Sequence, residues 1–265
     1  MKKKPQFRWT RWALVSSAVF GGFPMFAQAA GDHGFNWVHL IPGLSGLPNH
    51  VVMSTFVAIL LMATTAIAKS QLASASGQAE GGIIPDRKLT YKNFFELIAE
   101  ALFNVTEAIL GEKEAPRYFH VIGALFLYIF ISNLVGLIPG MLPPTDNLNT
   151  TLALGSFVFL YYNYLGFKEH GFGYLKHFMG PVLLLAPLIF AIELVSHLVR
   201  PLSLALRLRG NIVGDHMVLS IFHDIVPQLV PVVFYGIGLF VSFIQAFVFC
   251  LLTMVYISLS TSHDH

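Results

Sequence analysis

The sequence predicts an all-α polytopic membrane protein with about five membrane segments, the last two forming a long, steeply tilted helix hairpin. Of its 265 residues, 55% are hydrophobic and 11% are charged, whereas soluble domains carry about 25% charged residues. The charges are also unevenly placed, because Asp146 is the only one between Tyr118 and Phe167. Long apolar stretches without charges are typical of membrane spans.

Composition also excludes several classes of protein and site. The net charge of +2 is too small to indicate a nucleic-acid partner. The single cysteine, Cys250, lies in an apolar run, so neither a disulfide framework nor a cysteine-based metal site is expected. The sequence also contains no phosphate-binding P-loop and no nucleophile motif. We therefore expect no cofactor and no catalytic centre within this chain.

The first 29 residues have the features of a signal peptide. Five basic residues precede an apolar stretch at 13–26, and Ala27-Gln28-Ala29 fits the small-residue pattern of a cleavage site. Cleavage would leave residues 30–265 as a single membrane domain with its N-terminus outside the cytoplasm. An uncleaved first span is the alternative, although two glycines and Pro24 make this stretch a poor helix.

Apolar length predicts five spans and one surface helix. The spans cover residues 51–68, 118–138, 151–167, 181–222 and 226–260. Between the first two spans, residues 91–110 repeat apolar side chains at helical spacing, while Glu96, Glu100 and Glu107 face elsewhere. This pattern predicts an amphipathic helix that lies along the membrane surface.

The lysines and arginines predict the orientation. If the mature N-terminus is outside, the loops after the first and third spans are cytoplasmic, and these loops carry the basic residues. They are Lys69, Arg87, Lys88, Lys92, Lys113, Arg117, Lys168 and Lys176. The other two loops carry none. Since cytoplasmic loops are enriched in lysine and arginine, we predict a multi-pass topology with the N-terminus outside and the C-terminus inside.

The last two spans are too long to stand upright. At 1.5 Å per residue, residues 181–222 would extend roughly 60 Å and residues 226–260 about 50 Å. The hydrocarbon layer is only about 30 Å thick, and no loop signal divides either segment. We therefore predict that both helices are steeply tilted, with bends at Pro187 and Pro201.

The fourth span contains ionised residues that need an explanation. They are Glu193, Arg200, Arg207, Arg209 and Asp215. Each ionised group deep in a bilayer costs at least about 2.5–3.5 kcal/mol, so such groups usually face protein or water and mark an ion pathway. At about 100° per residue, small and polar residues fall within roughly 40° of Arg207 and form one continuous polar stripe. Its other members are Glu193, Ser196, Arg200, Ser203, Asn211 and Gly214.

Two of these arginines also have structural explanations. Arg200 lies on the same helix face as Glu193, seven residues earlier, so a structural ion pair and a place in the ion pathway both stay open. Arg209 lies near the opposite side of the helix from Arg207. Its position favours a side chain that extends to the membrane interface, with its aliphatic part in the apolar layer.

Two motifs stand out in the last two spans. The first runs Pro201-Leu-Ser-Leu-Ala-Leu-Arg-Leu-Arg-Gly-Asn211, and the second begins Gln245-Ala-Phe-Val-Phe and continues through Tyr256. Together they closely resemble the a subunit of F-type ATP synthase, the membrane stator that faces the rotating c ring. Weaker matches begin at Asn133 and Asn149, and the resemblance covers about residues 101–260.

The resemblance implies a proton-translocating stator subunit of the bacterial inner membrane that is not an enzyme by itself. Its implied partners are the c-subunit ring, the b-subunit peripheral stalk and membrane lipid, and its ion is H⁺ or Na⁺. In this family, two offset half-channels lead ions to a carboxylate on each c subunit, and the arginine matching Arg207 separates them. This charge favours the ionised carboxylate, and an arginine does not release its own proton near neutral pH.

By position, the resemblance assigns eight residues to proton translocation. They are Arg207, Gln245, Asn211, His216, Glu193, Ser196, Ser203 and Asp215. Gln245 is implied to hold the Arg207 guanidinium from the adjacent helix. Glu193 and the two serines match the cytoplasmic half-channel, and His216 matches the external one.

The chain departs from the family pattern at two positions. Arg209 stands where the family commonly has a bulky apolar residue, and Gly238 stands where many members have a histidine or an acid. The external path is therefore expected to depend on His216, Asp215, water or groups from other helices such as Asp146.

A stand-alone secondary ion transporter is the alternative function. Such a transporter would show internal repeats with broken helices in corresponding halves, and this sequence shows none. A purely structural membrane anchor would have no use for an arginine-containing stripe.

Overall fold

The structure, a computed structural model, describes residues 46–76, 91–138, 141–174, 186–225 and 230–261. Within these residues it contains helices and no strands, which confirms the all-α prediction. The helices are α2 (Asn49–Ser76), α3 (Tyr91–Leu110), α4 (Ala115–Val135), α5 (Leu148–His170), α7 (Ala186–Ile225) and α8 (Val230–Thr261), with 3₁₀ turns η2 (Pro144–Asp146) and η3 (Gly171–Gly173). The predicted signal peptide lies outside the described residues.

Four of these helices are long and apolar enough to cross a membrane: α2, α4, α7 and α8. Helix α3 has the bounds predicted for the amphipathic surface helix. The span predicted at 151–167 lies within α5, which is not one of the four, so the count of five spans stays a prediction.

Helix α4 forms the centre of the molecule. It is apolar on all sides, as expected of a buried helix, and 67% of its span is buried, against 17% for α2 and for α7. Its large side chains, among them Tyr118, Phe119 and Ile122, are fully buried and pack against α2, α3 and α8. The Tyr128 hydroxyl also forms a hydrogen bond with the Ser54 hydroxyl of α2.

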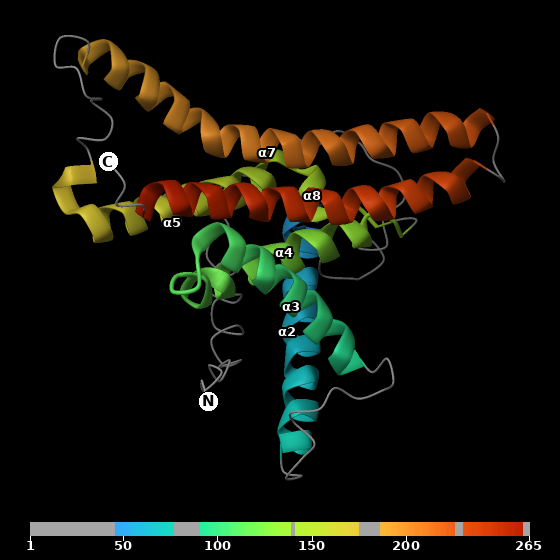
Figure 1. Cartoon of the computed structure of the whole chain (residues 1–265). Coiled ribbons are helices and arrows are strands. Elements are labelled where there is room, and N and C mark those ends of the chain that lie inside the picture. Colours follow the sequence, from blue (N-terminus) through green and yellow to red (C-terminus); the bar gives the residue numbers. More distant parts are fainter. Residues whose placement is uncertain (1–45, 77–90, 139–140, 175–185, 226–229, 262–265) are drawn as a thin grey trace.

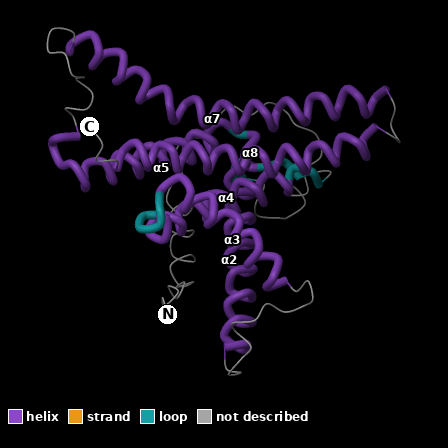
Figure 2. Tube along the Cα trace, in the orientation of Figure 1, coloured by secondary structure: helices purple, strands orange, loops and turns teal. Residues whose placement is uncertain are grey.

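Helices α7 and α8 lie side by side and run in opposite directions across the direction of α2 (Figures 1 and 2). The predicted hairpin of two long helices is therefore present, and its steep tilt in the membrane stays a prediction. The N-terminal part of α7 slopes relative to the rest, and Pro201 lies inside the helix. Pro187 lies beside residues outside the described part of the chain, so the bend predicted there stays a prediction.

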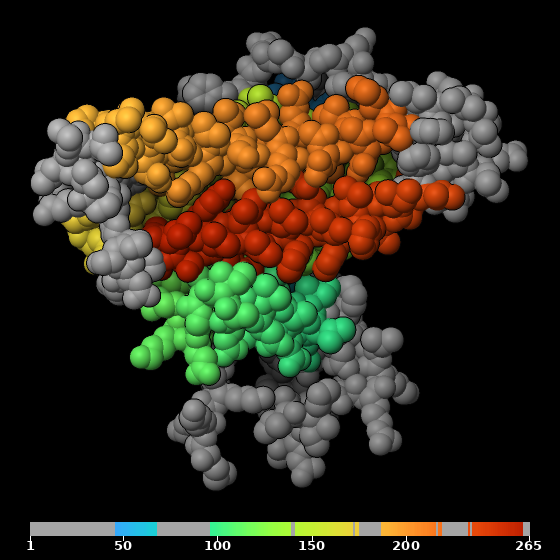
Figure 3. Space-filling view, turned by 45° about the horizontal axis from the view of Figure 1, so that its top comes forward, coloured from blue at the N-terminus to red at the C-terminus, as the bar shows by residue number. Residues whose placement is uncertain are grey.

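Helix α8 is divided into an exposed half and a buried half. Val233, Ile237 and Phe240 in its first half are 48–64% exposed. Phe249, Met254 and Ile257 in its second half are at most 2% exposed and belong to the core. The α7–α8 pair covers one face of the molecule (orange and red in Figure 3).

Helix α5 packs along α7 through a close backbone contact. A Cβ atom at Gly155 would lie 2.5 Å from the carbonyl oxygen of Pro201, so only glycine fits at this crossing. Gly171, with φ of 56°, ends α5 in the left-handed conformation that glycine adopts at no steric cost. The turn after Gly171 brings Tyr174 back against α5, where its ring contacts Phe167.

Candidate functional site

Helix α7 presents three distinct faces. One face is buried against the rest of the chain and includes His197, Leu204, Ala205, Leu208 and Ile212. A second face is apolar and exposed and includes Leu188, Ile192, Val195, Val199, Leu202 and Leu206. The polar stripe lies between them, and Ser196, Ser203, Arg207, Asn211 and Gly214 are all exposed. The stripe therefore forms an accessible polar surface along an otherwise apolar helix.

Arg207 lies near the middle of this stripe, beside α8. Among the residues that the structure describes, none forms an ion pair or a hydrogen bond with its guanidinium group. One turn further along α7, the Asn211 amide donates a hydrogen bond of 2.5 Å to Oε1 of Gln245, which is 3% exposed. This bond joins α7 to α8 directly beside Arg207. The structure does not form the implied hydrogen bond between Gln245 and the guanidinium itself, and Gln245 Oε1 accepts from Asn211 instead.

The N-terminal part of the stripe contains an ion pair. Arg200 Nη2 lies 3.3 Å from Glu193 Oε1, and the Arg200 guanidinium lies over the Tyr256 ring of α8, 5.4 Å from its centroid. The structural pairing that the sequence left open for Arg200 is therefore present. Both side chains remain partly exposed, so the pair lies at the surface of the stripe.

Behind the stripe lies a hydrogen-bond network that the sequence did not reveal. The Asn163 amide of α5 donates to the Phe159 carbonyl at 2.7 Å, so its Oδ1 atom is the acceptor of the network. Tyr174 donates to this atom at 3.2 Å, and His197 Nε2 lies 2.8 Å from it. His197 must therefore carry its proton on Nε2. Burial raises the pKa of the Tyr174 hydroxyl, which keeps this donor protonated.

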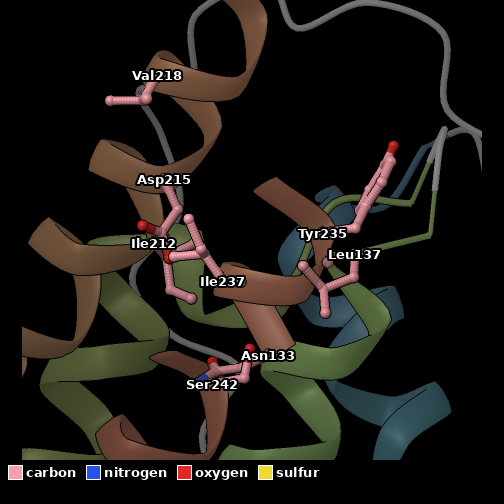
Figure 4. Close-up of a pocket in the computed structure, with 10 residues that line it drawn as sticks. Asn133, Leu137, Ile212, Asp215, Val218, Tyr235, Ile237 and Ser242 are labelled. Atoms are coloured by element: carbon pink, nitrogen blue, oxygen red, sulfur yellow. The ribbon is translucent and has the colours of Figure 1, made fainter. Parts of the chain in front are cut away.

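At the other end of the stripe, α4, α7 and α8 enclose a pocket of about 100 Å³ (Figure 4). Its lining residues are Asn133, Gly136, Leu137, Ile212, Asp215, Val218, Tyr235, Ile237, Gly238 and Ser242. Of the predicted site residues, Asp215 contributes a carboxylate to this pocket. The volume is sufficient for several water molecules, and the polar groups around it give them partners.

Gly238 gives this pocket its shape. A Cβ atom at Gly238 would lie 2.7 Å from Cδ2 of Leu137, so a larger residue would require Leu137 to move. Leu137 therefore fills the space beside this glycine. Among the described residues that line the pocket, Asp215 of α7 supplies the carboxylate. The side chain of His216 lies outside the described residues.

Asn133 is a polar residue of the pocket to which the sequence analysis assigned no function. It is 2% exposed, and its Oδ1 atom accepts a hydrogen bond of 2.8 Å from Thr145. Its Nδ2 donor has no hydrogen-bond partner among the described residues. Since buried donors usually have partners, this amide is well suited to bind a water molecule in the pocket. The weak motif that begins at Asn133 was the only signal of its role in the sequence.

Comparison with known proteins identifies relatives over most of the chain. A family model described as ATP synthase A chain matches residues 50–258. The ATP synthase subunit a of Bdellovibrio bacteriovorus is 45% identical over 232 residues, which cover 87% of this chain and 99% of that protein. The ATP synthase subunit a of Geobacter sulfurreducens is 52% identical over 174 residues, which cover 66% of this chain and 76% of that protein. The matched regions include the polar stripe and the pocket.

Proposed function

Since the chain belongs to the ATP synthase A chain family, we propose that it carries H⁺ or Na⁺ to and from a rotor through two half-channels that Arg207 separates. It is a non-catalytic, multi-pass inner-membrane subunit of the enzyme, and its partners are the c-subunit ring and the b subunit. The ion itself depends on the carboxylate site of the c subunit.

The observation that supports this function is the position of Arg207 in an exposed stripe without an ion pair among the described residues. An ionised group in a membrane span is costly unless a charged or polar partner compensates it. A carboxylate supplied by another polypeptide would provide that compensation. The stripe lies along α7 beside α8, on the face where a neighbouring subunit can reach it.

Arg207 would perform two tasks at this position. Its positive charge stabilises the ionised form of a c-subunit carboxylate that approaches it. The ion bound to that carboxylate is therefore released before the carboxylate passes Arg207. The same charge repels cations that would otherwise pass from one half-channel to the other. Arginine suits both tasks because a guanidinium group does not release its proton near neutral pH, so it stays charged even in an apolar setting.

The two half-channels would lie at opposite ends of the stripe. The end with Glu193, Ser196 and Ser203 is proposed as the cytoplasmic path, following the orientation that the basic loops predict. The pocket that contains Asp215 is proposed as the external path. Because Gly238 provides no titratable group, Asp215 would be the proton acceptor in this pocket, with Asn133 and Ser242 binding water beside it.

Disulfide crosslinking to the rotor tests this assignment. Ser203→Cys is expected to crosslink to a cysteine placed next to the carboxylate of the c subunit, because Ser203 is exposed on the stripe. Ala205→Cys, two residues further along the same helix and fully buried, is the matched control and is expected not to crosslink. The native Cys250 is fully buried and needs no replacement. Equal crosslinking at both positions, or none at Ser203, would contradict the proposed rotor face.

Substitution of Asp215 tests the external path. Asp215→Asn removes the proton acceptor, and we expect ATP-driven proton pumping to fall about tenfold or more, since a positioned proton-transfer group contributes factors of about 10²–10⁴ to such steps. Asp215→Glu keeps a carboxylate and is expected to retain most of the activity. Dye quenching by inverted membrane vesicles measures both variants. Wild-type pumping by Asp215→Asn would remove this residue from the path.

A further inference from the structure

Arg209 connects α7 to the η2 turn through a hydrogen bond. Its Nε atom donates a hydrogen bond of 3.2 Å to the backbone carbonyl of Asp146, 63 residues earlier in the chain. At about 100° per residue, Arg209 points about 200° away from Arg207 around α7. The side chain therefore reaches the η2 turn on the side of α7 that faces away from the polar stripe.

The η2 turn is itself fixed to several helices. It contacts α2, α4, α5 and α7. Thr145 is fully buried and donates to Asn133 of α4 at 2.8 Å. The next residue after the turn, Asn147, caps α5 by accepting a hydrogen bond of 2.9 Å from the Asn149 backbone. The turn is thus a rigid point to which α7 can be attached.

The hydrogen bond also satisfies a backbone group that lacks a helical partner. The carbonyls of Pro143, just before η2, and of Pro144 accept hydrogen bonds from the backbone of Asp146 and Asn147, whereas the Asp146 carbonyl accepts one from Arg209. The partner of the Asp146 carbonyl is therefore a side chain of α7 and not a group of its own turn. An apolar residue at position 209 provides no donor for this carbonyl.

We propose that Arg209 is a positioning residue that fixes the rotation of α7 about its own axis. Two bonds hold α7 just after Arg207: Arg209 attaches the helix to η2, and Asn211 attaches it to Gln245 of α8. These two side chains point about 160° apart around the helix. Two attachments on different sides of the helix resist rotation better than one, so Arg207, within about one turn of both, stays directed toward the rotor. This inference rests on the proposed role of Arg207.

The test has two separate measurements in the assembled complex: the accessibility of the η2 turn to a labelling reagent, and ATP-driven ion transport. A cysteine introduced as Asp146→Cys keeps the backbone carbonyl, and its labelling rate with a maleimide reports how firmly the turn is held. With Arg209→Leu, we expect labelling to become at least about threefold faster and ATP-driven pumping to fall about three- to tenfold. Arg209→Lys can donate to the same carbonyl and is expected to restore both to near wild-type values.

Arg207→Ala is the matched control, because it removes the same charge two residues away. It is expected to eliminate pumping while labelling at position 146 stays slow. Unchanged labelling with Arg209→Leu would overturn the attachment, and faster labelling with full pumping would overturn the positioning role. Failure of Arg207→Ala to affect pumping would instead contradict the proposed function, so the two failures are distinguishable. All rates are normalised to the amount of assembled subunit.

Discussion

Replacement of Arg207 by alanine is expected to reduce ATP-driven proton pumping to background. The substitution removes the one charge in the middle of the exposed polar stripe, where none of the described side chains can take its place. A passing carboxylate would then remain protonated, since nothing favours its ionised form. The measurement is dye quenching by inverted membrane vesicles, together with passive proton permeability after the catalytic sector is removed. We expect this permeability to rise, because the barrier between the two half-channels is lost.

Two further variants distinguish the role of Arg207 from that of charge in general. Arg207→Lys is expected to lose pumping as well, because a lysine in an apolar setting releases its proton more easily than an arginine. Arg200→Ala removes a charge from the same stripe, seven residues earlier, but this arginine is paired with Glu193. We expect only a partial loss from it. Substantial pumping by Arg207→Ala would contradict the proposed mechanism.

Replacement of Gly155 by valine is expected to prevent stable assembly of the subunit. A Cβ atom at this position would lie 2.5 Å from the Pro201 carbonyl oxygen, and the two further methyl groups of valine add to the overlap. The Pro201 carbonyl belongs to the backbone of a helix and cannot move aside alone, so α5 and α7 must separate along their shared contact. Overpacking of this kind costs about 1–3 kcal/mol, and occasionally more. The amount of subunit in purified complexes and its thermal stability measure the effect.

The control for this prediction is another helical glycine. Gly236 of α8 has no atoms within 4 Å of an added Cβ, so Gly236→Val is expected to assemble at the wild-type level. Gly155→Ala should be intermediate, because it adds one carbon instead of three. Normal assembly of Gly155→Val would show that the α5–α7 crossing adapts without loss of stability.

The parts of the fold that depend on local pattern could be predicted from the sequence. The amphipathic period predicted α3 with its observed bounds, and the 100° spacing predicted which residues share the polar stripe of α7. Length alone predicted the tilted hairpin, because the two segments exceed the membrane thickness. Each of these signals lies within one segment of the chain, so no knowledge of neighbouring helices was needed.

The remaining features depend on contacts between distant segments. Leu202 and Leu204 are chemically identical, yet Leu202 is 43% exposed and Leu204 is 2% exposed, because only one of the two apolar faces of α7 meets the rest of the chain. The bond from Arg209 to the Asp146 carbonyl joins residues 63 positions apart, and its acceptor is a backbone group that every residue has. No residue pattern identifies such a partner.

The Asn163 hydrogen-bond network and the Asp215 pocket, both beside the stripe, also depend on contacts between distant segments. His197 and Asn163 are 34 residues apart, and a single histidine on a leucine-rich helix face gives no indication of its partner. The sequence revealed that Gly238 departs from the family pattern, but it did not reveal that Leu137 fills the space. Asp215 could be named from its position, whereas its pocket required the arrangement of three helices.

The division of α8 into an exposed half and a buried half has a mechanical consequence. Under the proposed function, a ring that turned against the exposed half would push the helix sideways, and a free helix would bend under that load. The other half, with Phe249, Met254 and Ile257, is packed into the core beside α4. Because close-packed interiors are hardly compressible, such a load would pass along α8 into the stationary body of the subunit, and little of the torque would be lost to elastic deformation.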